Sequence, residues 1–148
     1  MTTPNSEIQT SKNFEHAQVS GQYSHALTFG NVSHAQTAGE HGHARTIGFS
    51  SHAQAAGFAS YAQAAGDSSN AQVSGYCGRA LAMGEDGIAC ALGLSSKVRA
   101  GENGVIVATW KDKTGRMKVL VGYPGKNGIE ADTWYCAKDG KWEKAESE

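Results

Sequence analysis

The chain has 148 residues, with 13 Lys and Arg, 14 Asp and Glu and a formal net charge of −1. This length suits one domain with a small appendage, and the near-zero charge removes the simplest argument for nucleic-acid binding. No apolar run approaches the ~20 residues of a membrane span, and the spacing of the three cysteines matches no metal site, so we expect reduced thiols and no membrane insertion.

The N-terminal segment, residues 1–12, is polar and lacks the apolar core of a signal peptide. Its residues 4–12 (PNSEIQTSK) are a degraded copy of the repeat that follows, with Ile8 at a position that is alanine in later copies. Stacked arrays need atypical end units, so we predict that residues 1–12 form an N-terminal cap.

Residues 13–93 consist of gapless nonapeptides such as NVSHAQTAG (31–39) and FSSHAQAAG (49–57). We number the positions of each nonapeptide as columns 1 to 9, with Ala in column 5 and Gly in column 9. A helix does not explain the pattern, because each Gly costs ~1 kcal/mol relative to Ala inside a helix. Short strands over columns 4–8, separated by Gly and Ser turns, fit better. We expect columns 5 and 7 to point inward and columns 4 and 6 to point outward.

Alternate nonapeptides resemble each other more than neighbours do. Column 6 reads Gln18, Gln36, Gln54 and Gln72 in one set of units and Leu27, Arg45, Gln63 and Leu81 in the other. Two units therefore make one coil of 18 residues. The predicted fold class is all-β, a two-sided parallel β-solenoid (β-roll) of nonapeptide half-coils. A degraded unit, 94–101 (LSSKVRAG), ends the array, so the repeat region spans residues 13–101.

Composition changes in residues 102–148, which contain all three tryptophans. The segments 105–110 and 117–123 are strand-like on either side of a turn at 113–115, and 132–137 and 141–144 continue the pattern. We predict a C-terminal antiparallel β meander that caps the solenoid, because an uncovered end exposes unpaired backbone groups and invites polymerisation.

Column 4 carries a histidine series: His16, His25, His34, His43 and His52. Imidazoles stacked one coil apart could bind a metal or an anion, or sense pH. A zinc site needs ligands that converge on one point, whereas a linear row does not converge. We therefore interpret the histidines as structural ladders and assign no metal site. The glutamine row of column 6 is interpreted in the same way, as an amide ladder.

The candidate binding residues come from the less regular set of units. His43, Arg45, Tyr61 and Arg79 break the repeat on one face, and Arg and Tyr are enriched at interface hot spots. We predict that these four residues contact a protein partner. Sequence drift would produce the same irregularity, and that alternative stays open.

Residue types argue against several other chemistries. Calcium-binding nonapeptides need an Asp in every unit, but only Asp67 and Asp86 occur in the array. An ice-binding face needs an outward row of Thr, whereas the Thr residues lie in the inward column 7. No nucleophile elbow, phosphate loop or paired-carboxylate motif is present. We therefore predict a non-enzymatic protein with no catalytic residues and no cofactor.

The nonapeptide array is followed by the ending VRAGENGVIVATWKDKTG…VGYPGKNGIEADTWYCAKDGKW. Together they resemble small uncharacterised phage and prophage proteins that carry Gly/Ala-rich short repeats and a C-terminal β module containing DTWY. The column-4 histidines depart from the plainer repeats of that group. The resemblance implies a phage or prophage setting, and it carries over no activity and no residue roles.

We therefore expect a binding protein of the bacterial host cytoplasm that presents a rigid surface to a host protein or complex. Inhibition of a host defence protein, such as a CRISPR complex, is the natural role in that setting. No direct nucleic-acid or membrane contact is expected, and a homo-oligomer stays open. The alternatives are a virion- or tail-associated structural or adhesion element, and a metal or small-ligand binder that uses the histidine rows.

Overall fold

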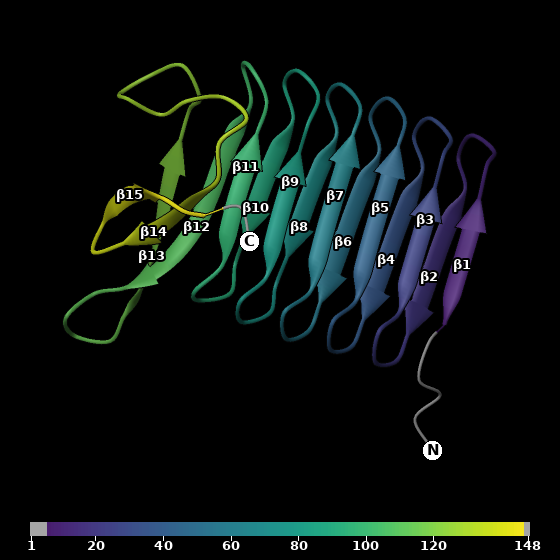
Figure 1. The fold of residues 1–148 in the computed structure, drawn as a ribbon, viewed down its shortest axis with the longest axis horizontal. Helices are drawn as coiled ribbons and strands as arrows, with labels where there is room; N and C mark the ends of the chain where they lie inside the picture. The colour runs from purple at the N-terminus through teal and green to yellow at the C-terminus, as the bar shows by residue number, and fades with distance from the viewer. Residues whose placement is uncertain (1–5, 147–148) are drawn as a thin grey trace.

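The computed structural model describes residues 6–146, which form two β-sheets and no helix (Figure 1). The eight-stranded sheet contains, in spatial order, β1 (Glu7–Thr10), β3 (His25–Thr28), β5 (His43–Ile47), β7 (Tyr61–Ala65), β9 (Arg79–Ala82), β11 (Lys97–Ala100), β14 (Tyr135–Lys138) and β15 (Lys141–Lys144). The seven-stranded sheet contains β13 (Met117–Gly122), β12 (Val105–Lys111), β10 (Ile88–Ala91), β8 (Asn70–Val73), β6 (His52–Ala56), β4 (His34–Ala38) and β2 (His16–Ser20). Successive strands up to β12 alternate between the sheets, so the chain winds as a coil.

Each strand up to β12 pairs in parallel with the strand one coil away. Ala35 lies opposite Ala53, 18 residues further along the chain. The predicted two-sided parallel β-solenoid with 18 residues per coil is confirmed, and it has about six turns. The degraded units take part in the winding, because β1 pairs with β3 and β11 pairs with β9. Residues 1–5 of the predicted N-terminal cap lie outside the described residues.

Columns 5 and 7 line the interior, as predicted. The column-5 alanines from Ala17 to Ala89 are at most 1% exposed, whereas His52 and Gln54 on either side of Ala53 are exposed. The residues of columns 5 and 7 from β2 to β10 are Ala, Thr or Val, so methyl groups line most of the two walls of the solenoid. Such a close-packed interior has little room for extra volume.

Each corner of the coil uses columns 9, 1, 2 and 3. The column-2 residue adopts the left-handed conformation, with φ between 52° and 61° from Phe14 to Asn103. The column-3 serine is buried and bonds to neighbouring coils. The Ser51 N–H donates to Oγ of Ser69 (3.0 Å), and Oγ of Ser51 donates to the carbonyl of Gly30 (3.2 Å). The burial of these serines was not predicted from the sequence, where they have the composition of a turn.

The column-9 glycines allow the corners of adjacent coils to approach closely. A Cβ atom on Gly57 would overlap the carbonyl oxygen of Gly39, one coil earlier, and Gly57 has a φ of 135°. Any other residue at this position would strain its own backbone and push the two coils apart. The close contact between the corners of adjacent coils therefore explains why glycine recurs in column 9.

The parallel stack continues one strand further than the sequence predicted. Residues 105–110 were assigned to the cap, but β12 pairs in parallel with β10, with Ile88 opposite Val105. This offset is 17 residues instead of 18, because the unit 94–101 is one residue shorter than the others. β12 therefore still pairs with the exposed edge of β10, although the unit between them, 94–101, has only eight residues.

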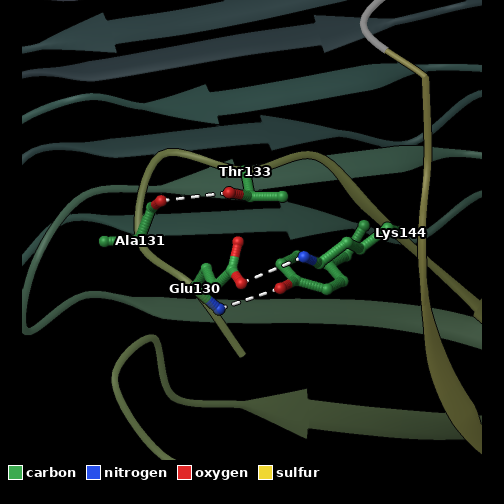
Figure 2. A network of polar contacts seen from close by, with 5 residues as sticks. Glu130, Ala131, Thr133 and Lys144 are labelled. Atoms are coloured by element: carbon green, nitrogen blue, oxygen red, sulfur yellow. Dashed lines mark hydrogen bonds and ion pairs between the residues drawn. The ribbon is translucent and has the colours of Figure 1, made fainter. Parts of the chain in front are cut away.

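The antiparallel strands of the predicted C-terminal cap extend both sheets. β13 pairs with β12, β14 pairs with β11, and β15 pairs with β14. Ile129 and Tyr135 join the core. The segment before β14 is held by an ion pair between Glu130 Oε1 and Lys144 Nζ (3.0 Å) and by a hydrogen bond from Glu130 N–H to the Tyr135 hydroxyl (2.8 Å; Figure 2).

Replacement of Ala53 by Leu tests the close packing of the interior. The larger side chain overpacks a position that is 1% exposed, so we expect a loss of about 1–3 kcal/mol in the free energy of unfolding. Denaturant titration measures this loss. The control Gln54→Leu puts the same side chain in column 6, where the chain itself has Leu27 and Leu81, and we expect little change. Equal losses in both variants would contradict the inward and outward assignment.

Replacement of Thr37 by Val tests the buried hydroxyl groups of column 7. Thr37 is fully buried, and its Oγ1 has no hydrogen-bond partner in the described structure. Val19 and Val73 occupy the same column of the same sheet, so the valine side chain fits. We expect Thr37→Val to raise the free energy of unfolding by about 1 kcal/mol, because a desolvated, unbonded hydroxyl is removed.

The control for that variant is Thr109→Val. The hydroxyl of Thr109 donates to the carbonyl of Leu92 (3.0 Å), so its removal deletes a bond and gives no gain. A Thr37→Val protein that is no more stable than the parent would contradict the assignment of an unbonded hydroxyl.

Candidate partner-binding face

The four residues predicted to bind a partner lie together on the outer face of the eight-stranded sheet. His43 and Arg45 belong to β5, Tyr61 to β7 and Arg79 to β9. The register aligns His43, Tyr61 and Arg79 in one row, with Arg45 beside them in the next row. The structure thus brings the four side chains onto one surface, and their role in binding stays a prediction.

A hollow of about 250 Å³ marks this surface. It contains three of the four predicted residues and is completed by neighbouring positions of columns 4 and 6. Its lining includes His25, Leu27, His43, Arg45, Tyr61 and Gln63. The carboxylate of Glu7 also lines the hollow, so apolar, aromatic and cationic groups and one acidic group meet in one shallow depression.

Three arginines of the same sheet influence Tyr61: Arg79 lies opposite it on β9, Arg45 lies on β5, and Arg99 lies on β11, two strands away. Burial raises the pKa of the Tyr61 phenol, while the charges of Arg79, Arg99 and Arg45 act in the opposite direction. Within residues 6–146, the ion pairs join Lys138 to Glu143 and Lys144 to Glu130, and none includes these guanidinium groups. Their positive charge is therefore available to an anionic group of another molecule.

Arg99 is one of these three arginines and was not predicted from the sequence. It lies on β11 opposite Leu81, and its Nε is buried without a hydrogen-bond partner in the described structure. The unit 94–101 was interpreted only as an end unit of the array. The available signal was its alignment, because LSSKVRAG places Arg99 in column 6, the column of Arg45.

The opposite face, on the seven-stranded sheet, carries regular ladders. The rings of His16, His34 and His52 stack with centroid separations of 4.7 and 4.8 Å, and Nδ1 of His52 lies 3.2 Å from Nδ2 of Asn70. The column-6 glutamines are aligned in register, but within residues 6–146 no side-chain hydrogen bond joins one glutamine to the next. Stacking and strand pairing therefore hold this face, without the predicted amide bonds.

A row of aromatic rings follows one corner of the solenoid. Tyr23 stacks on His41 (5.1 Å), His41 meets the edge of Phe58 (6.1 Å), and Phe58 stacks on Tyr76 (6.1 Å). The two stacked pairs link successive corners of the coil, while Tyr23, Phe58 and Tyr76 remain about half exposed.

The described residues contain no group of three or more His, Cys, Asp or Glu side chains that could hold a metal ion. They also contain no helix long and apolar enough to cross a membrane. No protein-family model, curated protein or solved structure matches this chain. The geometry defines the class of protein, a parallel β-solenoid with antiparallel C-terminal strands.

Acidification tests the stacked histidines. Burial lowers the pKa of His34, and the neighbouring His52 and His16 lower it further. Burial also lowers the pKa of His43, and His25 and His41 lower it further. A histidine that binds its proton less tightly when folded stabilises the fold above its ordinary pKa of 6.5, and that contribution is lost as the pH falls toward the lowered value. We therefore expect the free energy of unfolding to decrease below about pH 6.5.

The variant His34→Asn should flatten this dependence of the free energy of unfolding on pH, because it removes a titrating imidazole. The fold should accept the change, since Asn70 occupies the same column of the same sheet. The control Gln54→Asn changes an exposed, uncharged side chain on that face, and its stability should follow the parent at every pH. Denaturant titrations between pH 7 and pH 5 compare the three proteins. A parent protein that gains stability on acidification would contradict the assigned pKa directions.

Proposed function

We propose that this chain is a non-enzymatic binding protein that presents the outer face of its eight-stranded sheet to a protein partner. The observation that carries the proposal is that Arg45, Arg79 and Arg99 lie on three strands of the sheet that contains Tyr61, with no ion pair to these arginines within residues 6–146. Arg and Tyr are among the side chains enriched at interface hot spots. The partner surface that fits these arginines carries carboxylates.

The backbone supports the proposal through its rigidity. His43, Arg45, Tyr61 and Arg79 project from strands that are hydrogen-bonded on both sides. The backbone of such strands is already ordered before a partner arrives, so docking orders side chains but little additional backbone. The entropic cost of binding is therefore limited mainly to the arginine side chains.

The setting of the proposal comes from the resemblance of the sequence to small phage and prophage proteins. In that setting the chain acts in the bacterial cytoplasm, and its partner is a host protein or complex. Inhibition of a host defence protein, such as a CRISPR complex, is the role that we propose for the bound state. Neither a reaction nor a cofactor forms part of this proposal.

The double variant Arg45→Gln, Arg79→Asn tests the face. Gln63 and Asn70 show that the repeat accepts Gln in column 6 and Asn in column 4, so the fold should survive both changes. We expect recovery of a stoichiometric partner from a nuclease-treated bacterial lysate to fall at least about tenfold, because hot-spot arginines are removed. Quantitative mass spectrometry of the recovered proteins measures the change.

The matched control is Gln54→Leu on the opposite face, which should leave recovery unchanged. A partner that is retained equally by all three proteins would place the interface elsewhere. Recovery of no stoichiometric partner, together with detection of the chain in purified virions, would replace the proposal by a structural role in the particle.

A further inference from the structure

The seven-stranded sheet ends in a strand that has only one neighbour. β13 pairs with β12 and with no other strand of the described chain, and it lies at the end of the stack opposite β1 (Figure 1). The Asp112 N–H donates to the carbonyl of Arg116 (3.0 Å), which fixes the alternation of the β12–β13 ladder. In an antiparallel pair, hydrogen-bonded and non-bonded positions alternate. Lys118, Leu120 and Gly122 therefore bond to β12, and the backbone groups of Met117, Val119 and Val121 face the open edge.

The residues with open backbone groups also carry exposed apolar side chains. Met117, Val119 and Val121 are 49%, 62% and 45% exposed. Val121 lies opposite Val107, which in turn lies opposite Cys90, so the apolar surface crosses three strands. An apolar edge strand of this kind readily pairs with another extended chain unless it is covered.

The segment that contains β13 is basic, which favours an acidic chain as its cover; outside this segment, Asp139 lines a hollow with Asp112 and Lys113. Residues 111–126 contain five basic side chains (Lys111, Lys113, Arg116, Lys118 and Lys126) and one acidic side chain, Asp112, so their net charge is 5 − 1 = +4. Oδ1 of Asp112 already accepts hydrogen bonds from the Thr114 hydroxyl (2.6 Å) and from the N–H groups of Thr114 and Arg116 (2.8 and 3.0 Å). A second copy of this chain would bring the same positive charges to the edge, whereas an acidic segment would neutralise them.

We infer that β13 is the docking edge for an extended acidic segment of a partner protein, which adds to the seven-stranded sheet as a further strand. Its backbone bonds to Met117, Val119 and Val121. Its apolar side chains lie on the face of those three residues, and its carboxylates alternate with them and lie on the face of Arg116 and Lys118. This edge is separate from the arginine face proposed above, and neither proposal depends on the other.

A short synthetic peptide of alternating valine and glutamate tests the inference with the full chain, with its lysine counterpart as the charge control. We expect the glutamate peptide to bind, by fluorescence anisotropy, at least about tenfold more tightly than the lysine peptide. Val119→Pro should weaken binding by about tenfold or more, because proline removes an N–H that points outward from an edge strand. Arg116→Glu with Lys118→Glu should reverse the preference between the peptides, and this variant keeps the test decisive if the proline variant does not fold.

The variant Arg45→Gln separates this edge from the arginine face and should leave peptide binding unchanged. Equal binding of both peptides, binding that survives Val119→Pro in a folded protein, or no binding of the glutamate peptide would each overturn the inference. A dimer in analytical ultracentrifugation that Val119→Pro dissociates would also overturn it, because the edge would then be occupied by a second copy.

Discussion

The contact of each residue with its counterpart one coil away is the constraint on which this structure depends. Strand pairing sets the coils ~4.8 Å apart, so the side chains of one column meet along the whole solenoid. His16 and His34 show the result, with rings 4.7 Å apart and 7° from parallel. A residue type persists in a column only if it packs against its own copy at this distance. Alanine does so inside the coil, glycine does so at the corner, and imidazole does so on the outer face.

The polar columns satisfy the same constraint through hydrogen bonds. Oδ1 of Asn13 accepts from the N–H of Asn31 (2.8 Å), and Oδ1 of Asn31 accepts from the N–H of Phe49 (2.9 Å). The buried serines of column 3 bond to the corners of neighbouring coils in the same periodic way. Corners that would otherwise bury unpaired backbone groups are thus bonded by their own repeat, which explains how a chain with so small an apolar interior can stack.

The period of the sequence predicts the coil because each residue of every unit packs against its counterpart one coil away. The alternation between Gln36 and Arg45 in column 6 revealed the two faces, and the inward position of Ala53 followed from strand geometry. What the sequence could not predict depends on contacts between coils. Ser51 has the composition of a turn residue, and its burial arises from partners 18 and 21 residues away. β12 follows a shortened unit, and its parallel pairing comes from the exposed edge of β10.

The candidate face also contains residues that the sequence period predicted and one that it did not. An 18-residue coil is enough to bring His43, Tyr61 and Arg79 into one row, so their adjacency was predictable from the period alone. Arg99 was missed because its unit has lost a residue and most of its consensus, although it keeps its column. Departures from a repeat are therefore best sought column by column, including the end units, because the stacked backbone preserves a column after the consensus has been lost.

Each coil of the solenoid exposes strand edges on which a further coil can pair, and the C-terminal strands end this stacking. β13 runs antiparallel to β12, and β14 runs antiparallel to β11, so the reversal of strand direction ends the register that a further coil would need. The reversal stops the coil but does not remove the backbone groups at the last edge. Val107 opposite Val121 carries the apolar surface up to that edge, while Arg116 and Lys118 place positive charge along it. The termination of the solenoid thus creates a surface that disfavours a further copy of the repeat and remains able to pair with an extended chain of opposite charge.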